Sequence, residues 1–228
     1  MKKWIALILA LVLALSMTAC GKTESVAGKV EPQEETELAE SPVTMGRLEG
    51  GTYINEYTGY GCDLDSSWTF YTAEELQELP GNVKEILAGT EIGDSINTLA
   101  QFMDVMAENV DMLTTMNVVY QKLSMQERLA YALLTDEEIL DEVLKLKDSM
   151  IESFAQAGME VESMEETTVT FLGKERPALR TVATNNGVPQ YTLQVFDFRL
   201  GQYSVTLTAT SFIDDNTQWV LDQFHSVD

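Results

Sequence analysis

One cysteine near the start of the chain stands in a context that favours covalent chemistry. Cys20 follows Met17-Thr18-Ala19, and a lysine pair and an unbroken apolar run, Trp4–Leu15, come before them. This order is typical of a lipoprotein signal peptide, and a cysteine thiolate suits a stable thioether bond to lipid. We therefore predict a signal peptide over residues 1–19 and acylation, for example by palmitate, at Cys20. The alternatives are an ordinary secretory leader and an uncleaved anchor.

The other groups that could perform catalysis form no recognisable constellation. The single histidine, His225, stands near the end of the chain, where we expect the exposed end of a helix. The sequence has no Gly-x-Ser-x-Gly or Ser-x-x-Lys motif and no phosphate-binding glycine loop. The 37 acidic residues make a close carboxylate pair expected, but none is marked out for glycoside hydrolysis. We expect no enzymatic activity and no cofactor.

Two acidic pairs are weak candidates for a calcium site. Asp63 and Asp65 end a predicted strand, and Asp214 and Asp215 lie in a predicted loop. Carboxylate oxygens suit calcium, but neither pair has the spacing of an EF-hand, and turns and helix caps use the same residues. We predict no metal site. Cys62 has no second cysteine for a disulfide once Cys20 is acylated, and we expect a buried thiol on the apolar face of a strand.

Net charge and composition divide the chain. The formal charge of −23 argues against nucleic acid and anionic surfaces as partners, and it favours either simple solubility or a partner with a basic face. Residues 20–49 are rich in glutamate and contain no aromatic residue, which predicts a flexible acidic linker. About thirty such residues span on the order of 30 Å. We place one folded domain at 50–228.

Hydrophobic periodicity predicts strands and helices in the first half of this domain. A hairpin is expected from Tyr53–Tyr57 and Tyr60–Leu64, with Trp68–Phe70 continuing its sheet. A capping box, Thr72-Ala73-Glu74-Glu75, begins a helix that ends at Pro80. Residues 92–110 fit both periods, so 101–108 are open between helix and strand. We favour a helix to Ala100 followed by a hairpin that includes 114–123.

The second half is predicted as a long helix, four strands and a closing helix. The long helix runs from Thr135 through Phe154 to Gly158. Glycine-bearing turns separate strands at 169–171, 179–184, 191–198 and 203–211. In the last strand the alternation predicts one buried and one solvated face, the latter formed by Ser204, Thr206, Thr208 and Thr210. The sum is an α+β fold, a twisted antiparallel sheet flanked by helices.

Scattered glycine and aromatic positions resemble a known family. These are Gly51-Thr52-Tyr53-Ile54-Asn55, Gly59, Trp68 and Phe171-Leu172-Gly173, followed by the strands and terminal helix. The arrangement resembles the PsbP-like domains of many bacterial lipoproteins, a fold shared with the photosystem II extrinsic subunit and a Ran-binding import factor. Those domains often have a proline before the tryptophan, where this chain has Asp65-Ser66-Ser67. The resemblance implies an α-β-α sandwich that binds or scaffolds without enzymatic activity.

These observations predict a lipid-anchored protein on the extracytoplasmic face of the cell membrane. Its expected role is binding or scaffolding, with a protein or another cell-envelope component as partner. Aromatic residues dominate interfaces, so the candidate contact residues are Tyr53, Tyr57, Trp68 and Trp219. The alternative is an envelope enzyme, or a carrier of a small ligand or cation, with a cleft between the long helix and the sheet.

Overall fold

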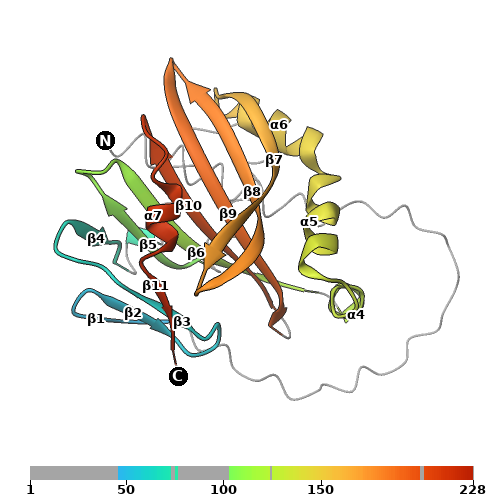
Figure 1. Cartoon of the computed structure of the whole chain (residues 1–228), viewed down its shortest axis with the longest axis horizontal. Coiled ribbons are helices and arrows are strands. Elements are labelled where there is room, and N and C mark those ends of the chain that lie inside the picture. Colours follow the sequence, from blue (N-terminus) through green and yellow to red (C-terminus); the bar gives the residue numbers. More distant parts are fainter. Residues whose placement is uncertain (1–45, 73–74, 77–102, 124, 201–202, 228) are drawn as a thin grey trace, which may run out of the picture.

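The computed structural model describes residues 46–72, 75–76, 103–123, 125–200 and 203–227 (Figure 1). The predictions for the signal peptide, for Cys20 and for the helix ending at Ala100 lie outside these residues, as does the helix ending at Pro80 beyond residue 76. So does all of the predicted linker before residue 46. None of the described helices is long and apolar enough to cross a bilayer.

A seven-stranded antiparallel sheet forms the body of the fold. Its spatial order is β4-β5-β6-β10-β9-β8-β7. The strands are β4 (Trp68–Phe70), β5 (Met103–Asn109), β6 (Thr114–Lys122), β7 (Glu160–Phe171), β8 (Lys174–Asn185), β9 (Val188–Leu200) and β10 (Tyr203–Phe212). The four predicted C-terminal strands are confirmed and are longer than expected. The open choice at 101–108 is decided for residues 103–108, which are strand.

A second, four-stranded sheet was not expected. It has the order β1-β2-β3-β11, with β1 (Arg47–Glu49), β2 (Thr52–Asn55), β3 (Tyr60–Asp63) and β11 (Phe224–Ser226). The hairpin of β2 and β3 is confirmed, and Gly59 takes the left-handed conformation at φ 74° in its turn. The prediction for residues 68–70 was wrong, because β4 pairs with β5 in the large sheet.

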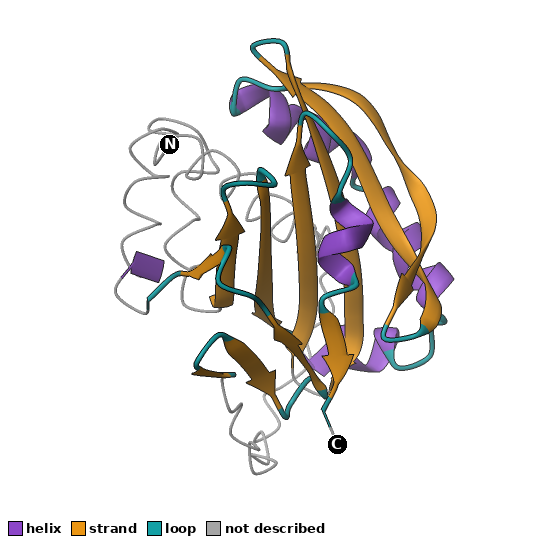
Figure 2. Ribbon diagram, turned by 60° about the vertical axis from the view of Figure 1, so that its left-hand side comes forward, coloured by secondary structure: helices purple, strands orange, loops and turns teal. Residues whose placement is uncertain are grey.

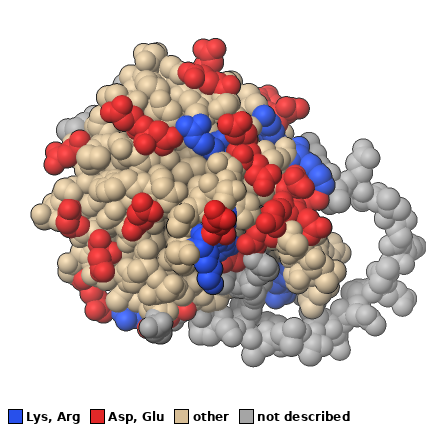
Figure 3. Space-filling view, viewed as in Figure 1, with Lys and Arg blue, Asp and Glu red and all other residues tan. Residues whose placement is uncertain are grey.

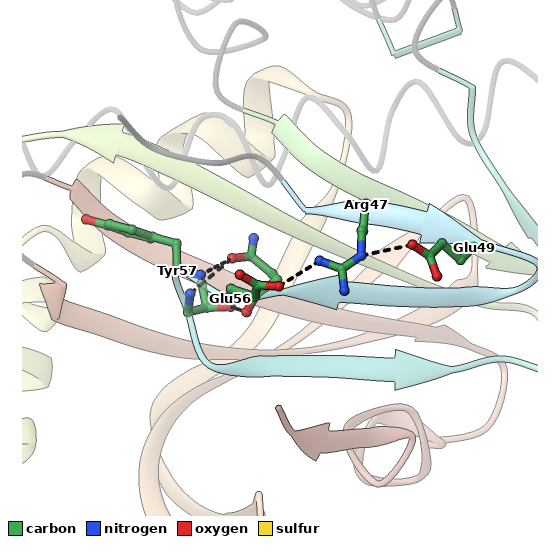
Figure 4. A network of polar contacts seen from close by, with 6 residues as sticks. Arg47, Glu49, Glu56 and Tyr57 are labelled. Atoms are coloured by element: carbon green, nitrogen blue, oxygen red, sulfur yellow. Dashed lines mark hydrogen bonds and ion pairs between the residues drawn. The ribbon is translucent and has the colours of Figure 1, made fainter. Parts of the chain in front are cut away.

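The first strand of the small sheet shows that the folded domain begins before the predicted start at residue 50. Residues 47–49 were assigned to the linker, but β1 pairs with β2. Arg47 holds this edge from the surface, donating to Glu49 at 3.0 Å and to Glu56 at 2.8 Å (Figure 4). The Arg47 side chain is half exposed, so water screens both ion pairs and they stabilise the edge little.

The predicted long helix is two helices. α5 (Asp136–Leu144) begins with a capping box, in which the Glu138 amide donates to the Thr135 hydroxyl at 3.2 Å and the Thr135 amide donates to the Glu138 carboxylate at 2.8 Å. α6 (Lys147–Gln156) follows a break at Lys145-Leu146. α5 packs on β8 and β9 and α6 packs on β7, so the break lets each half follow its own strands.

Two short helices complete the described part of the chain, α4 (Met125–Tyr131) and α7 (Thr217–Leu221). The closing helix is therefore shorter than predicted. Phe224 and His225 belong to β11, and His225 is exposed in that strand instead of at a helix end. The capping box predicted at Thr72 is confirmed, because the Glu75 amide donates to the Thr72 hydroxyl and the Thr72 amide to the Glu75 carboxylate.

The large sheet is covered differently on its two faces (Figure 2). α5 and α6 pack on one face, which we call the helix face, around Phe154, Leu179 and Ala183. The small sheet and α7 pack on the other, the inter-sheet face, around Tyr53, Leu207 and Val220. The α+β class holds, but the expectation of helices on both faces was wrong, since a sheet provides most of one cover.

Acidic side chains are spread over the surface seen in Figure 3, among fewer basic ones. This distribution follows from the net charge of −23. Cys62 lies inside, as predicted, with none of its surface exposed between the sheets. Burial raises the pKa of its thiol to about 12, so it packs as a small apolar residue.

Candidate functional site

The face predicted to meet solvent on the last strand is buried. Ser204, Thr206, Thr208 and Thr210 are each less than a tenth exposed, so the prediction of a solvated face on β10 was wrong. The alternation of apolar and polar residues correctly assigned the side chains of β10 to two faces. It did not show that β10 is the middle strand of seven, where both faces are covered.

Polar residues of four neighbouring strands meet on this face. We call them the polar tract; they are Thr115, Asn117, Thr181, Thr192, Gln194, Thr208 and Thr210, all buried. Strand register sets them in two rows. Thr208 of β10 lies between Asn117 of β6 and Gln194 of β9.

The second row runs across one strand more. Thr210 of β10 lies between Thr115 of β6 and Thr192 of β9, and Thr192 pairs in turn with Thr181 of β8. Because strands are about 4.8 Å apart and alternate residues about 7 Å apart, the tract measures roughly 14 by 7 Å.

Hydrogen bonding within the tract is incomplete. Both amide atoms of Asn117 lack a partner among the described residues, as do Oε1 of Gln194 and the hydroxyls of Thr115, Thr181 and Thr210. The contact from Gln194 Nε2 to the Thr208 hydroxyl is long, at 3.5 Å. Six buried polar atoms in two adjacent rows are therefore unsatisfied by the described protein.

The number of unpaired atoms makes the tract unusual for a buried surface. A buried polar atom without a partner costs about 1 to 3 kcal/mol. Six such atoms cost on the order of 10 kcal/mol, comparable with the whole stability of a domain, about 5 to 15 kcal/mol. Apolar side chains border the tract, with Met106 beside Asn117 and Leu179 beside Gln194 in register, and both are buried.

A second polar cluster lies where the two sheets meet. The carboxylate of Asp104 accepts hydrogen bonds from the hydroxyl of Tyr53, from Asn55 Nδ2 and, at 2.8 Å, from the Gly46 amide. Asn55 also donates to the hydroxyl of Tyr120. Burial raises the pKa of Asp104 and outweighs the hydrogen bonds, which lower it.

In contrast to the polar tract, this cluster is internally paired. The side chain of Asn55 also accepts hydrogen bonds from the amides of Tyr57 and Thr58, each at 3.0 Å, and so fixes the turn after β2. Because its donors and acceptors satisfy one another, the cluster joins β2 of the small sheet to β5 and β6 of the large one. We interpret it as a structural joint.

Two of the four predicted contact residues belong to the core. Tyr53 and Trp68 are buried in the core between the sheets, which excludes both from a docking surface and corrects that prediction. Tyr57 and Trp219 are half-buried against the same core. Trp219 stacks on Trp68 with ring centroids 5.7 Å apart, so it covers the end of the core.

The weak calcium candidates have local roles. Asp63 accepts from the Thr52 hydroxyl at 2.7 Å, and Asp65 accepts from the Ser67 amide at 2.8 Å. Asp215 pairs with Arg180 at 2.8 Å, and its pKa is lowered because hydrogen bonds from Thr217 and Arg180 outweigh the opposing effect of burial. Asp214 is exposed. Across the described ranges no three histidine, cysteine or acidic residues are placed to hold a metal ion.

Comparison with known proteins gives a structural likeness. No family model and no curated protein matches the chain. Among solved structures it is similar to the solution structure of cyanobacterial PsbP from Synechocystis sp. PCC 6803, with a TM-score of 0.43 and 11% identity over 77% of this chain and 91% of that one. This is a likeness in outline of the fold. Membership of the PsbP-like lipoproteins stays a prediction.

Sequence reasoning missed the polar tract and Asp104. Asp104 was detectable as a single acid inside the apolar run from Met103 to Ala107. The tract also left a signal, because threonine, asparagine and glutamine alternate with apolar residues at 115–117, 190–194 and 206–210. Which of these strands would be neighbours was not contained in that signal.

Proposed function

We propose that this protein is a lipid-anchored, extracytoplasmic binding protein that holds a small polar ligand on the polar tract. The anchor follows from the signal-peptide pattern before Cys20. The ligand site rests on one observation, the six buried polar atoms without a protein partner on adjacent rows of the helix face. Burial of Tyr53 and Trp68 removes support for the aromatic docking surface, which makes a small ligand the better candidate.

The tract supports binding more than catalysis. It consists of hydroxyls and amides, which are neither bases nor strong nucleophiles without an activating partner. The pKa-shifted carboxyl group of Asp104 belongs to the structural joint instead. We therefore propose retention of a ligand near the membrane, with no bond made or broken.

The anchor is tested by acylation and location. The unmodified chain and its Cys20→Ser variant are expressed in a bacterium that processes lipoproteins. The N-terminal peptide of the first should carry a diacylglyceryl mass at Cys20 and the protein should fractionate with membranes. The variant should carry no lipid. Recovery of an unmodified leader, or of the unmodified chain with cytosolic proteins, contradicts the proposal.

The ligand site is tested by what leaves the protein when it unfolds. The tract side chains have almost no accessible surface, so a ligand reaches them only when the elements that cover them open. A molecule held there should dissociate slowly and survive purification. Native mass spectrometry of the full chain should show added mass that disappears on denaturation. The tract variant Asn117→Leu should not carry that mass, whereas a variant of an exposed strand threonine, Thr168→Val, should keep it. Equal loading of both variants contradicts a site at the tract.

A further inference from the structure

The edge strands of the two sheets differ in length. β1, β4 and β11 are three residues long, and a strand that short offers few backbone groups to another chain. The fourth edge strand, β7, has 12 residues, and among the described strands it pairs only with β8. An exposed edge of this length is a surface on which another chain can add a strand.

The first half of β7 is not available for such pairing. Its register shifts between Val161 and Ser163, and Met164 is 1% exposed in the core that α5 and α6 cover. From residue 165 to residue 170 the register is continuous, and most of the residues are exposed. Residues 165–170, which we call the open edge, extend over about 20 Å.

The hairpin between β7 and β8 decides which backbone groups of the open edge point outward. Phe171 and Lys174 are partners on either side of a two-residue turn, and such residues exchange backbone hydrogen bonds. Hydrogen-bonded and non-hydrogen-bonded pairs alternate from there along an antiparallel ladder. The N–H and C=O groups that face away from β8 are therefore those of Glu166, Thr168 and Thr170.

Two observations agree with this alternation. The Thr170 carbonyl accepts from Nε2 of Gln218 in α7 at 2.8 Å, and it is the one outward group with a partner among the described residues. Pro177 of β8 is the register partner of Thr168, so its missing N–H would face β9, whose pairing with β8 begins only at Leu179. The open edge therefore presents unpaired backbone donors and acceptors.

Two carboxylates lie within the open edge. Glu165 and Glu166 are consecutive, so their side chains point to opposite faces of the strand, and both are exposed. Arg180, which is in register with Glu165, is bound to Asp215 at 2.8 Å. Lysine or arginine side chains of an added strand would therefore meet a negative charge on either face.

A third carboxylate lies at the far end of the open edge. Asp222 of α7 accepts from Gln218 Nε2 at 2.8 Å, the same group that donates to the Thr170 carbonyl. Like charges repel, and the whole chain has a formal charge of −23, so a second copy of the chain is disfavoured as the added strand. A basic segment of another protein is favoured for the same reason.

We infer that the open edge binds an extended, lysine- or arginine-bearing segment of another protein, which pairs as an added strand with Glu166, Thr168 and Thr170. Backbone hydrogen bonds supply the pairing, and the carboxylates select basic side chains. The polar tract lies on β6, β8, β9 and β10, so this interaction depends neither on the proposed ligand nor on the anchor.

Synthetic peptides and the purified full chain test the pairing. The probe is acetyl-Thr-Lys-Val-Lys-Thr-Val-Lys-Thr-amide. One counterpart carries glutamate in place of lysine, and another is the basic peptide with alternate backbone nitrogens methylated. Only the unmethylated basic peptide should bind in calorimetry, and added salt should weaken its binding. Equal binding of the methylated peptide would reduce the contact to charge attraction and overturn the inference, as would a basic peptide that does not bind.

Hydrogen exchange locates the contact along the strand. In the free chain the amides of Glu166, Thr168 and Thr170 should exchange fast and those of the intervening residues slowly. The basic peptide should protect these three amides. If they exchange slowly without peptide, another segment or a second copy of this chain already occupies the edge, and the inference is wrong.

Variants at one position separate backbone pairing from side-chain contact. Thr168→Pro removes an outward N–H and keeps the hydrogen bonds to β8, so binding should weaken at least about tenfold. Thr168→Val keeps the N–H and should bind like the unmodified chain. If the proline variant does not fold, Glu165→Gln combined with Glu166→Gln serves instead and should weaken binding and its dependence on salt. Unchanged binding in the folded variant contradicts the inference.

Discussion

The two faces of the seven-stranded sheet are built from the same strands, and both are buried at the middle strand, yet they differ in chemistry. On the inter-sheet face the middle strand presents Val205, Leu207 and Ala209, all buried against the small sheet and α7. On the helix face the same strand presents Thr206, Thr208 and Thr210. Burial alone therefore does not select apolar residues here. The inter-sheet face is packed with apolar side chains, and the helix face keeps polar atoms that have no hydrogen-bond partner among the described residues.

The largest effect is expected from a substitution that creates a cavity on the inter-sheet face. Leu207 is 1% exposed, so Leu207→Ala should lower the free energy of unfolding by about 2 to 5 kcal/mol. Urea denaturation of the purified chain measures the change, and Thr168→Ala on exposed β7 is the control. A loss below about 1 kcal/mol would show that this face is not the packed core.

The joint between the sheets should give the next largest effect. Asp104→Ala removes the acceptor of the Tyr53 hydroxyl and one of the acceptors of Asn55 Nδ2, so we expect a loss of about 1 to 3 kcal/mol. Asp104→Asn, which keeps an acceptor oxygen, should lose less. Glu56→Ala, at an exposed site, should stay close to the unmodified chain. Equal losses in both Asp104 variants would argue against the pairing described above.

The same carboxyl group should make stability depend on pH. Because its pKa is raised in the folded state, the folded chain binds a proton more readily than the unfolded one does. Its contribution is therefore present below the ordinary carboxyl pKa of 3.8 and is lost as pH rises through the raised value. Compared with Asp104→Asn, the unmodified chain should lose stability over this interval. Parallel urea titrations from about pH 3 to about pH 7 measure the difference, and parallel curves would contradict a raised pKa.

The smallest expected change in stability compares two buried threonines, and its direction should differ between them. Thr210 and Thr217 are both buried, but the Thr210 hydroxyl lacks a partner among the described residues whereas the Thr217 hydroxyl donates to Asp215 at 2.6 Å. In the ligand-free chain, Thr217→Val should lower the free energy of unfolding by about 0.5 to 1.5 kcal/mol. Thr210→Val should leave it unchanged or raise it by up to about 1 kcal/mol. Thermal unfolding of the two variants compares them directly. A clear loss in Thr210→Val would show that its hydroxyl is satisfied.

Local patterns predicted most elements and few of their neighbours. The capping boxes at Thr72 and Thr135 and the hairpin turn at Gly59 were predictable because each depends on residues within four positions. The break at Lys145-Leu146 was not, because the apolar stripe continues through it and the strands below decide where the helix turns. β1 and β11 are three residues each, too short for a periodic signal, and form by pairing with β2 and β3.

By itself the sequence determined the α+β class, the alternation that divides each strand into two faces, the acidic character of the chain and the predicted site of acylation. These depend on residue type and on spacing along the chain. Tertiary structure decided that Tyr53 and Trp68 are core, that threonines of the middle strand are buried, and that polar groups from β6, β8, β9 and β10 meet in one tract. The reason is physical: burial and hydrogen-bond partners depend on which strands become neighbours, and residues such as Asn117 and Gln194 meet through pairings far apart in the sequence.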